Sequence, residues 1–181
     1  ATPVYMKPLF FSGDAPPRES HRLDIKNTSP TAQALERKLI AHLRAAAAKA
    51  DAVMVLDQLA EENTGTVTRA LREEVARLAA LRPEQLFFAD SRAFLQHFQN
   101  VTLKCNHLEA ARLTRQSAPE EFSKKAVFSA LDKLRRQTGR PAFITCGDQG
   151  IACRSQGAKC LVPAVRQPGP IDICGAGDAT S

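Results

Sequence analysis

The feature that most constrains this chain is an alternation of short apolar runs with longer segments of helical periodicity. The apolar runs cover 52–56, 86–89, 101–105 and 142–146. Continuous apolar runs of this length are typical of strands buried on both faces of a sheet. Strands that alternate with helices form parallel sheets with right-handed crossovers. We therefore predict an α/β fold in which a parallel sheet has flanking helices.

Three segments between or before these runs repeat their apolar residues at helical spacing. Leu35, Leu39 and Leu43, for example, recur every four residues. Helices are predicted over 31–50, over 67–78 and over 122–134, the last preceded by capping-box spacing in the segment 117–120.

The two ends of the chain differ from this pattern. Residues 3–11 alternate loosely and predict a strand, and 23–25 predicts a second, shorter one. Between them, 12–22 is a polar, proline-containing excursion. Near the other end, 151–153 and 160–162 predict two short strands joined as a hairpin.

Composition excludes several classes of protein. The 181 residues are 44% apolar, and no run approaches the ~18 apolar residues of a membrane span. Lys and Arg number 25 against 19 Asp and Glu, which gives a net charge of +6. The basic residues occur in pairs and aromatic residues make up only 6%, so solvated helix faces explain the charge better than a nucleic-acid surface. We expect neither nucleic acid nor a membrane as a partner.

The five cysteines contain no CxxC pair and are odd in number, so they signal neither a zinc site nor a disulfide framework. Most lie in apolar runs, which favours buried, reduced thiols and a cytoplasmic protein. The motifs HExxH, GxSxG, GxGxxG and GxxxxGK[ST] are absent, so zinc hydrolases, serine hydrolases, dinucleotide oxidoreductases and P-loop enzymes lack a starting point.

Polar residues or glycine stand at the ends of the predicted strands: Asp57, Asp90, Asn106 and Gly147. Ligands of open α/β sheets bind at the carboxyl ends of the strands. We therefore expect the functional site at this edge.

The sharpest motif is the run from Asp172 to Asp178, which reads DICGAGD. Its glycines let the backbone approach a ligand closely, and successive amides can hold an anion. A carboxylate at Asp178 can then accept a proton from a hydroxyl that attacks the phosphorus. The alternative is a glycine-rich turn before a helix, with Asp178 as a partner of the helix dipole.

Two further segments follow predicted strands. Asn106 and Glu109 share one helical face, where Glu109 can hold Mg²⁺ directly or through water. The alternative is an N-cap Asn with an ordinary first-turn Glu. Thr145, Gly147 and Gly150 form a strand end and a glycine-bounded turn that suits a phosphate, with a plain β-turn as the alternative.

Taken in this order, the three segments resemble the ribokinase-like (PfkB) carbohydrate kinase family in its NxxE segment, its TxGxxG turn and its DTxGAGD signature. Within that family, the segment Thr2–Lys7 followed by Arg22-Leu23-Asp24 is similar to the heptose-phosphate kinase branch. In that case Lys7 and Arg22 help to hold an acidic sugar; the alternative is that they are solvated strand charges.

The resemblance implies ATP and Mg²⁺ as cofactors and assigns a role to each motif. Asp178 is implied as the catalytic base. The other implied residues are Gly175, Ala176 and Gly177 for the anion hole, Asn106, Thr145, Gly147 and Gly150 for the nucleotide, and Glu109 for the metal.

The implied reaction is ATP-dependent phosphorylation of a sugar or sugar-phosphate hydroxyl by in-line transfer. The alternative is a non-catalytic module of the same fold that binds a nucleotide or sugar phosphate. Residues 1–181 are then expected to be the middle and later part of one kinase domain, without its N-terminal sugar-binding and lid portion and its C-terminal adenine-side helices. This part alone is expected to show little or no activity. A homodimer is a further implication.

Overall fold

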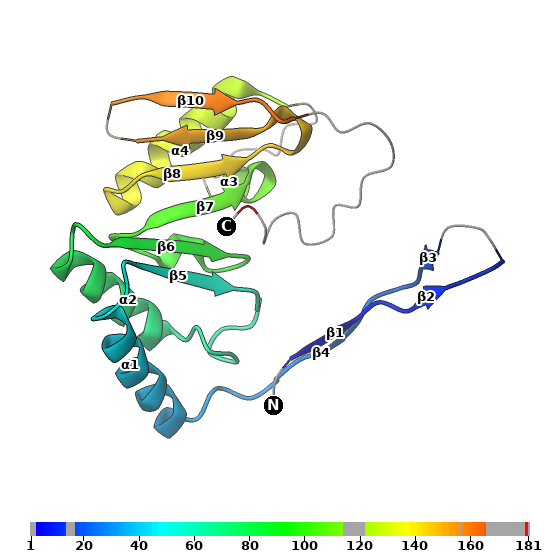
Figure 1. Ribbon diagram of the computed structural model, residues 1–181, viewed down its shortest axis with the longest axis horizontal. Coiled ribbons are helices and arrows are strands. Elements are labelled where there is room, and N and C mark those ends of the chain that lie inside the picture. The colour runs from blue at the N-terminus through cyan, green and yellow to red at the C-terminus, as the bar shows by residue number, and fades with distance from the viewer. Residues whose placement is uncertain (1–2, 14–16, 114–121, 156, 166–179, 181) are drawn as a thin grey trace.

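A six-stranded mixed sheet organises the computed structural model, which describes residues 3–13, 17–113, 122–155, 157–165 and 180 (Figure 1). The spatial order is β10-β9-β8-β7-β6-β5. Strands β5 to β8 are parallel, whereas β9 is antiparallel to β8 and to β10. The predicted α/β fold is confirmed. The strands are β5 (Ala52–Asp57), β6 (Leu86–Ser91), β7 (Thr102–Asn106), β8 (Ala142–Thr145), β9 (Ile151–Arg154) and β10 (Lys159–Val162).

Four α-helices accompany the sheet within the described ranges: α1 (Gln33–Ala47), α2 (Arg69–Leu81), α3 (His107–Leu113) and α4 (Lys124–Thr138). Two short 3₁₀ turns occupy Leu95–His97 and Gly147–Gln149. Because β5 to β8 are adjacent in chain order, right-handed crossovers place their connecting helices on one face of the sheet. In Figure 1, α4 crosses behind β8, β9 and β10. None of the helices in these ranges has the length and apolar character needed to cross a membrane.

The two faces of the sheet differ in burial. Side chains on the helix-covered face, such as Val55, Phe87 and Leu103, belong to the hydrophobic core. On the other face, which we call the open face, Met54, Leu56 and Leu86 stay 43–51% exposed. Alternation along each strand puts one set of residues on each face. At β5 and the start of β6 the open face is therefore an exposed apolar surface.

Helix α4 begins later than the sequence indicated. Its N-cap is Ser123, whose hydroxyl accepts a hydrogen bond from the Ala126 amide at 3.3 Å, and Phe122 precedes the helix. The predicted capping box at 117–120 lies outside the described residues. The helix ends at Gly139, whose φ of 69° is the left-handed conformation that glycine adopts without cost.

A two-stranded arm reaches away from the sheet (Figure 1). Strand β1 (Val4–Met6) pairs with β4 (Leu23–Ile25), and farther out β2 (Leu9–Phe10) pairs with β3 (Arg18–Glu19). The sequence predicted one strand over 3–11 and a polar excursion over 12–22. The structure instead divides the first segment at Lys7 and Pro8 and turns part of the excursion into a strand, because β2 has β3 as a partner.

Acidic partners lie beside the two basic residues of the arm that the resemblance connected with an acidic sugar. Lys7 Nζ lies 2.6 Å from Glu19 Oε2, and Arg22 Nε lies 2.6 Å from Asp24 Oδ1. These exposed ion pairs fit the alternative of strand charges at the surface, and each stabilises the arm only weakly.

A charged cluster joins α1 to α2. Glu74 of α2 is buried, with 7% of its side chain exposed, and accepts hydrogen bonds from Arg44 of α1 at 2.8 Å and from Arg77 at 2.6 Å. The Arg77 and Arg44 guanidinium groups lower the pKa of Glu74 from 4.5 to about 2. The ionised carboxylate therefore stabilises the contact between the two helices.

Replacing Glu74 by Gln should cost about 1 kcal/mol of unfolding free energy at neutral pH, because both guanidinium partners are half exposed and screened. Since the folded-state pKa is depressed, the wild-type advantage is present above the unfolded value of 4.5 and disappears as the pH falls toward about 2. Urea unfolding of both proteins across this range measures the difference. Glu73→Gln, at an exposed neighbouring position, is the control; a wild-type advantage that persists at pH 2 contradicts the assignment.

Candidate active site

The carboxyl ends of the parallel strands bring polar side chains together at one edge of the sheet. The register pairs Asp90 of β6 with Lys104 of β7, and Asn106 of β7 with Thr145 of β8. Alternation places all four on the open face. Asp57 of β5 points instead to the helix-covered face, so it does not belong to this group.

Lys104 and Asp90 form an ion pair with low exposure. Lys104 Nζ donates to Asp90 Oδ2 at 2.7 Å, and the two side chains are 6% and 16% exposed. A buried charge is tolerated only with a compensating partner. Lys104 belongs to no motif of the sequence; its signal was a lysine inside the otherwise apolar run 101–105.

Asn106 and Glu109 form a reciprocal capping box at the start of α3. Asn106 Oδ1 accepts from the Glu109 amide, and Glu109 Oε2 accepts from the Asn106 amide, both at 2.8 Å. This is the geometry of a helix N-cap with a carboxylate at the third helical position. The structural alternative for this motif is therefore present, yet it engages only one of the two Glu109 carboxylate oxygens.

Glu109 lies in an environment that disfavours its own charge. Burial raises the pKa of its carboxyl group, and the nearby negative charge of Asp90 adds to the effect, whereas the hydrogen bond from the Asn106 amide and the charge of Lys104 oppose it. A divalent cation would relieve this penalty. Mg²⁺ is commonly held by one or two carboxylates together with water and phosphate oxygens, so Glu109 fits such an ion. No cluster of three or more His, Cys, Asp or Glu side chains suited to a metal occurs among the described residues.

The turn after β8 is tightly closed. The Cys146 amide donates to the Gly150 carbonyl at 2.8 Å, and the 3₁₀ turn Gly147–Gln149 lies between them. The Thr145 hydroxyl makes a long contact of 3.5 Å with the Cys105 carbonyl. Gly147 has a φ of 59°, and a Cβ placed on it would meet no atom within 4 Å. A ligand can therefore approach the backbone at Gly147.

Gly150 has a different steric role. Its φ is 100°, and a Cβ there would collide with the Val162 carbonyl oxygen and the Ala164 amide. The requirement for glycine at this position thus comes from the last residue of β10 and the segment that follows it. Gly150 connects the turn to the hairpin.

Asp57 lies on the helix-covered face of the sheet, away from these site residues. The Ser91 hydroxyl donates to its Oδ2 at 2.9 Å, and Asp57 is 5% exposed. Burial raises the pKa of the Asp57 carboxyl group, although the Ser91 hydrogen bond and the Leu59 amide oppose that effect.

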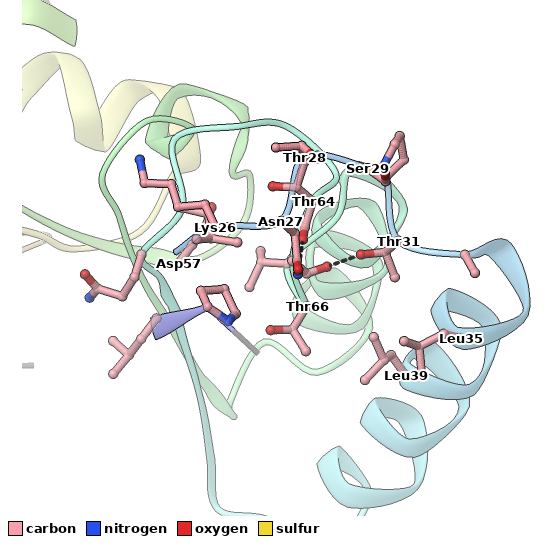
Figure 2. Close-up of a pocket in the computed structure, with 18 of the residues that line it drawn as sticks. Lys26, Asn27, Thr28, Ser29, Thr31, Leu35, Leu39, Asp57, Thr64 and Thr66 are labelled. Atoms are coloured by element: carbon pink, nitrogen blue, oxygen red, sulfur yellow. Dashed lines mark hydrogen bonds between the residues drawn. The ribbon is translucent and has the colours of Figure 1, made fainter. Parts of the chain in front are cut away.

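A hollow of about 1100 Å³ lies between the base of the arm, the start of α1 and the loop after β5. Figure 2 shows Lys26 and Asp57 on one side of it and Leu35 and Leu39 of α1 on the other. This hollow does not include Asn106, Glu109 or the turn after β8. It is a concave surface distinct from the candidate site.

Polar residues at the rim of this hollow hold the segment before α1 against the loop after β5. Asn27 Nδ2 donates to the Thr64 carbonyl at 3.1 Å, and the Thr31 hydroxyl donates to the Gly65 carbonyl at 2.7 Å (Figure 2). Sequence reasoning missed these residues. The available signal was the density of Asn and Thr in both segments, which face each other only after folding.

The glycine-rich signature cannot be placed beside these groups, since Gly175, Ala176, Gly177 and Asp178 lie outside the described residues. Of the predicted site residues, the structure brings Asn106, Glu109, Thr145 and Gly147 to one edge of the sheet.

Replacing Asn106 by Ala should lower the unfolding free energy by about 1 kcal/mol, because α3 loses the acceptor for its Glu109 amide. Asn106→Ser keeps a capping oxygen and should restore most of that loss. Chemical denaturation of the two variants measures the effect. Equal losses in Ala and Ser would show that the cap is not what Asn106 contributes to stability.

A family model described as the pfkB family of carbohydrate kinases matches residues 19–181. No curated protein matches the chain.

Among solved structures, ribokinase from Giardia lamblia is similar, with a TM-score of 0.63 and 15% identity. The match covers 96% of this chain and 52% of the ribokinase chain. Phosphofructokinase-2 from Escherichia coli in complex with substrates and products has a TM-score of 0.58 and 16% identity. The match covers 88% of this chain and 51% of the phosphofructokinase. A nucleoside kinase from Burkholderia thailandensis in complex with inosine has a TM-score of 0.51 and 17% identity. The match covers 97% of this chain and 52% of the nucleoside kinase.

At these identities the solved structures show a shared fold, and the chain spans about half the length of each. The family model, in contrast, matches most of the sequence, including the run that ends in GAGD. The chain therefore belongs to the pfkB family of carbohydrate kinases.

Proposed function

We propose that the protein containing this chain phosphorylates a hydroxyl group of a sugar or sugar phosphate with ATP. The observation that carries the proposal is the family match over 19–181, which spans every motif of the candidate site. The geometry adds support, because Asn106 and Thr145 are adjacent on neighbouring strands and Gly147 presents open backbone beside them.

In this proposal the described residues position the nucleotide. Thr145, Gly147 and Gly150 line its phosphates through the turn after β8, and Asn106 adds an amide side chain from the neighbouring strand. Catalysis of phosphoryl transfer rests mainly on positioning and on stabilising negative charge. The rigid closure of the turn by Cys146 and Gly150 suits that task.

Glu109 is the proposed holder of Mg²⁺. Its second carboxylate oxygen remains after the capping box is made, and its raised pKa reflects burial that a cation would offset. When bound, Mg²⁺ neutralises charge on the transferring phosphates. The chain's own contribution is to hold one carboxylate at a fixed position on α3.

Asp178 is the proposed general base, and Gly175, Ala176 and Gly177 are the proposed anion hole. This part of the proposal rests on the sequence motif and on the family. A carboxylate that accepts the hydroxyl proton makes the oxygen a better nucleophile, while backbone amides stabilise charge on the transferred group.

We further propose that residues 1–181 are the middle and later part of one kinase domain. Two observations support this division. The similar solved structures are about twice as long, and the open face of the sheet leaves Met54, Leu56 and Leu86 about half exposed. Further elements of a complete domain would cover this face. In that case residues 1–181 alone have little or no kinase activity. The cytoplasmic location, a separate point, stays a prediction.

A second copy of the protein is the proposed partner of the arm. Its exposed apolar side chains are Val4, Met6, Leu9, Phe10, Phe11, Leu23 and Ile25, with exposures of 41–75%. Pairing of two arms in a homodimer would remove this apolar surface from water.

The heptose-phosphate branch also remains a prediction. The two basic residues connected with its acidic sugar, Lys7 and Arg22, are paired with Glu19 and Asp24 in this structure.

The alternative function is a non-catalytic module that binds a nucleotide or sugar phosphate. The structural capping role of Asn106 and Glu109 is the observation that keeps it open. The presence of Asp178 favours the kinase, because a module without catalysis has no need of a base at the end of the GAGD run.

Changing Asp178 to Asn in the whole protein should lower kcat by about 10²–10⁴-fold, because general-base catalysis typically contributes that much. Nucleotide affinity should change little. A panel of sugars and sugar phosphates, screened by ADP release, identifies the substrate on which kcat is measured. Near-normal turnover by Asp178→Asn contradicts the role of the base, and nucleotide binding without turnover by the wild type would favour the alternative.

Changing Glu109 to Gln should raise the Mg²⁺ concentration required for half-maximal turnover by about tenfold or more, since a carboxylate ligand is lost. Glutamine keeps the hydrogen bond to the Asn106 amide, so stability should change little. The measurement is a Mg²⁺ titration of turnover at fixed nucleotide. Glu73→Gln on α2 is the control, and an unchanged Mg²⁺ requirement in Glu109→Gln contradicts the proposed ligand.

A further inference from the structure

Two cysteines face each other across the β9–β10 hairpin. Cys153 and Cys160 are directly paired in the antiparallel register, and their Sγ atoms are 3.0 Å apart. Directly opposed residues have Cα atoms about 4.5–5.5 Å apart, within the range that a disulfide bond spans. A bond between these sulfurs therefore requires little movement of the backbone.

The pair also differs from the other described cysteines in access. Cys160 is exposed and Cys153 is partly buried, whereas Cys105 and Cys146 are buried. Burial raises the pKa of Cys105 and of Cys146, which keeps both as unreactive thiols. Among the cysteines that the structure describes, the hairpin pair alone combines an accessible sulfur with a second sulfur in contact.

The two sulfurs are not equivalent. The thiol–thiol hydrogen bond with Cys160 raises the pKa of Cys153, and partial burial adds to the effect. Cys153 is also the less exposed of the two. The exposed Cys160 is the sulfur that a reagent in solution meets first.

We propose that Cys153 and Cys160 form a thiol–disulfide site that a low-molecular-weight disulfide oxidises to an intrachain bond. The Cys160 thiolate attacks one sulfur of the small disulfide, so that a mixed disulfide forms and half of the reagent leaves as a thiolate, which takes up the proton that Cys160 released. Cys153 then attacks the Cys160 sulfur, and the second half leaves with the proton of Cys153. Two protein thiols are oxidised, and one small disulfide is reduced to two thiols.

The site adjoins the candidate nucleotide turn. Ile151 pairs with Val162 two residues along from the cysteine pair, and the Val162 carbonyl and Ala164 amide pack against Gly150. A bond between Cys153 and Cys160 would tie β10 to β9 next to this contact. The oxidised hairpin should therefore open less often.

The test treats the whole native protein with oxidised glutathione and maps its disulfides by mass spectrometry after trypsin digestion. Arg154 and Lys159 lie between the cysteines, so the bond joins the peptide that ends at Arg154 to the peptide that begins at Cys160. The expected product is this linked pair, lighter by two hydrogen atoms than the two reduced peptides. Cys146 shares the first peptide, and the linked pair should persist in Cys146→Ser.

Single variants test the order of attack. Cys153→Ser should accumulate a mixed disulfide at Cys160, whereas Cys160→Ser should leave Cys153 reacting several-fold more slowly than Cys160 does in Cys153→Ser. Hydrogen exchange of the β10 amides should slow several-fold in the oxidised wild type and remain unchanged in Cys153→Ser after the same treatment.

Three outcomes would overturn the proposal: a bond from Cys160 to another cysteine such as Cys174, loss of the linked pair in Cys146→Ser, or stable mixed disulfides in the wild type without an intrachain bond. Each readout is a mass or an exchange rate, so none depends on whether the protein is a kinase.

Discussion

Burial of one sheet face against helices is the constraint on which the rest of this structure depends. Val55, Phe87, Leu103 and Ile144 contribute to a single core from four neighbouring strands. Apolar side chains packed this way supply the main favourable free energy of folding. The same packing fixes the register of the strands, and the register is what sets Asn106 beside Thr145 and Asp90 beside Lys104. The candidate site is therefore a consequence of core packing at one edge of the sheet.

Much of this fold could be predicted from the sequence, because local signals carried it. Apolar runs predicted β5 to β8 at nearly their observed positions, and four-residue spacing predicted α1 and α2. The arm was less predictable. Its strands are two or three residues long and gain stability only from one another, so no periodicity within 12–22 could indicate β3. The start of α4 was also hard to predict, because Ser123 caps the helix without a Glu or Gln three residues later, so no capping-box pattern marks it.

The candidate site was predictable to a different extent. Asn106, Glu109, Thr145 and Gly147 were named from motifs, and the sheet brings them to one edge. The Lys104–Asp90 pair was not named, because its partners lie on different strands and meet only through the parallel register. Gly150 shows the same limit. Its constraint arises from Val162 and Ala164, which follow it in the chain but reach it only through the hairpin.

The anchoring of the segment before α1 has a mechanical consequence for the arm. Thr31 and Asn27 are hydrogen-bonded to the loop after β5 through Asn63, Thr64 and Gly65. These bonds hold the segment that follows β4 against the loop at the rim of the hollow. An arm movement that preserves these hydrogen bonds leaves Asp57, Thr64 and Gly65 fixed in the frame of the sheet. The hollow would still change in shape, because Pro3 and Tyr5 of the arm line it together with those residues.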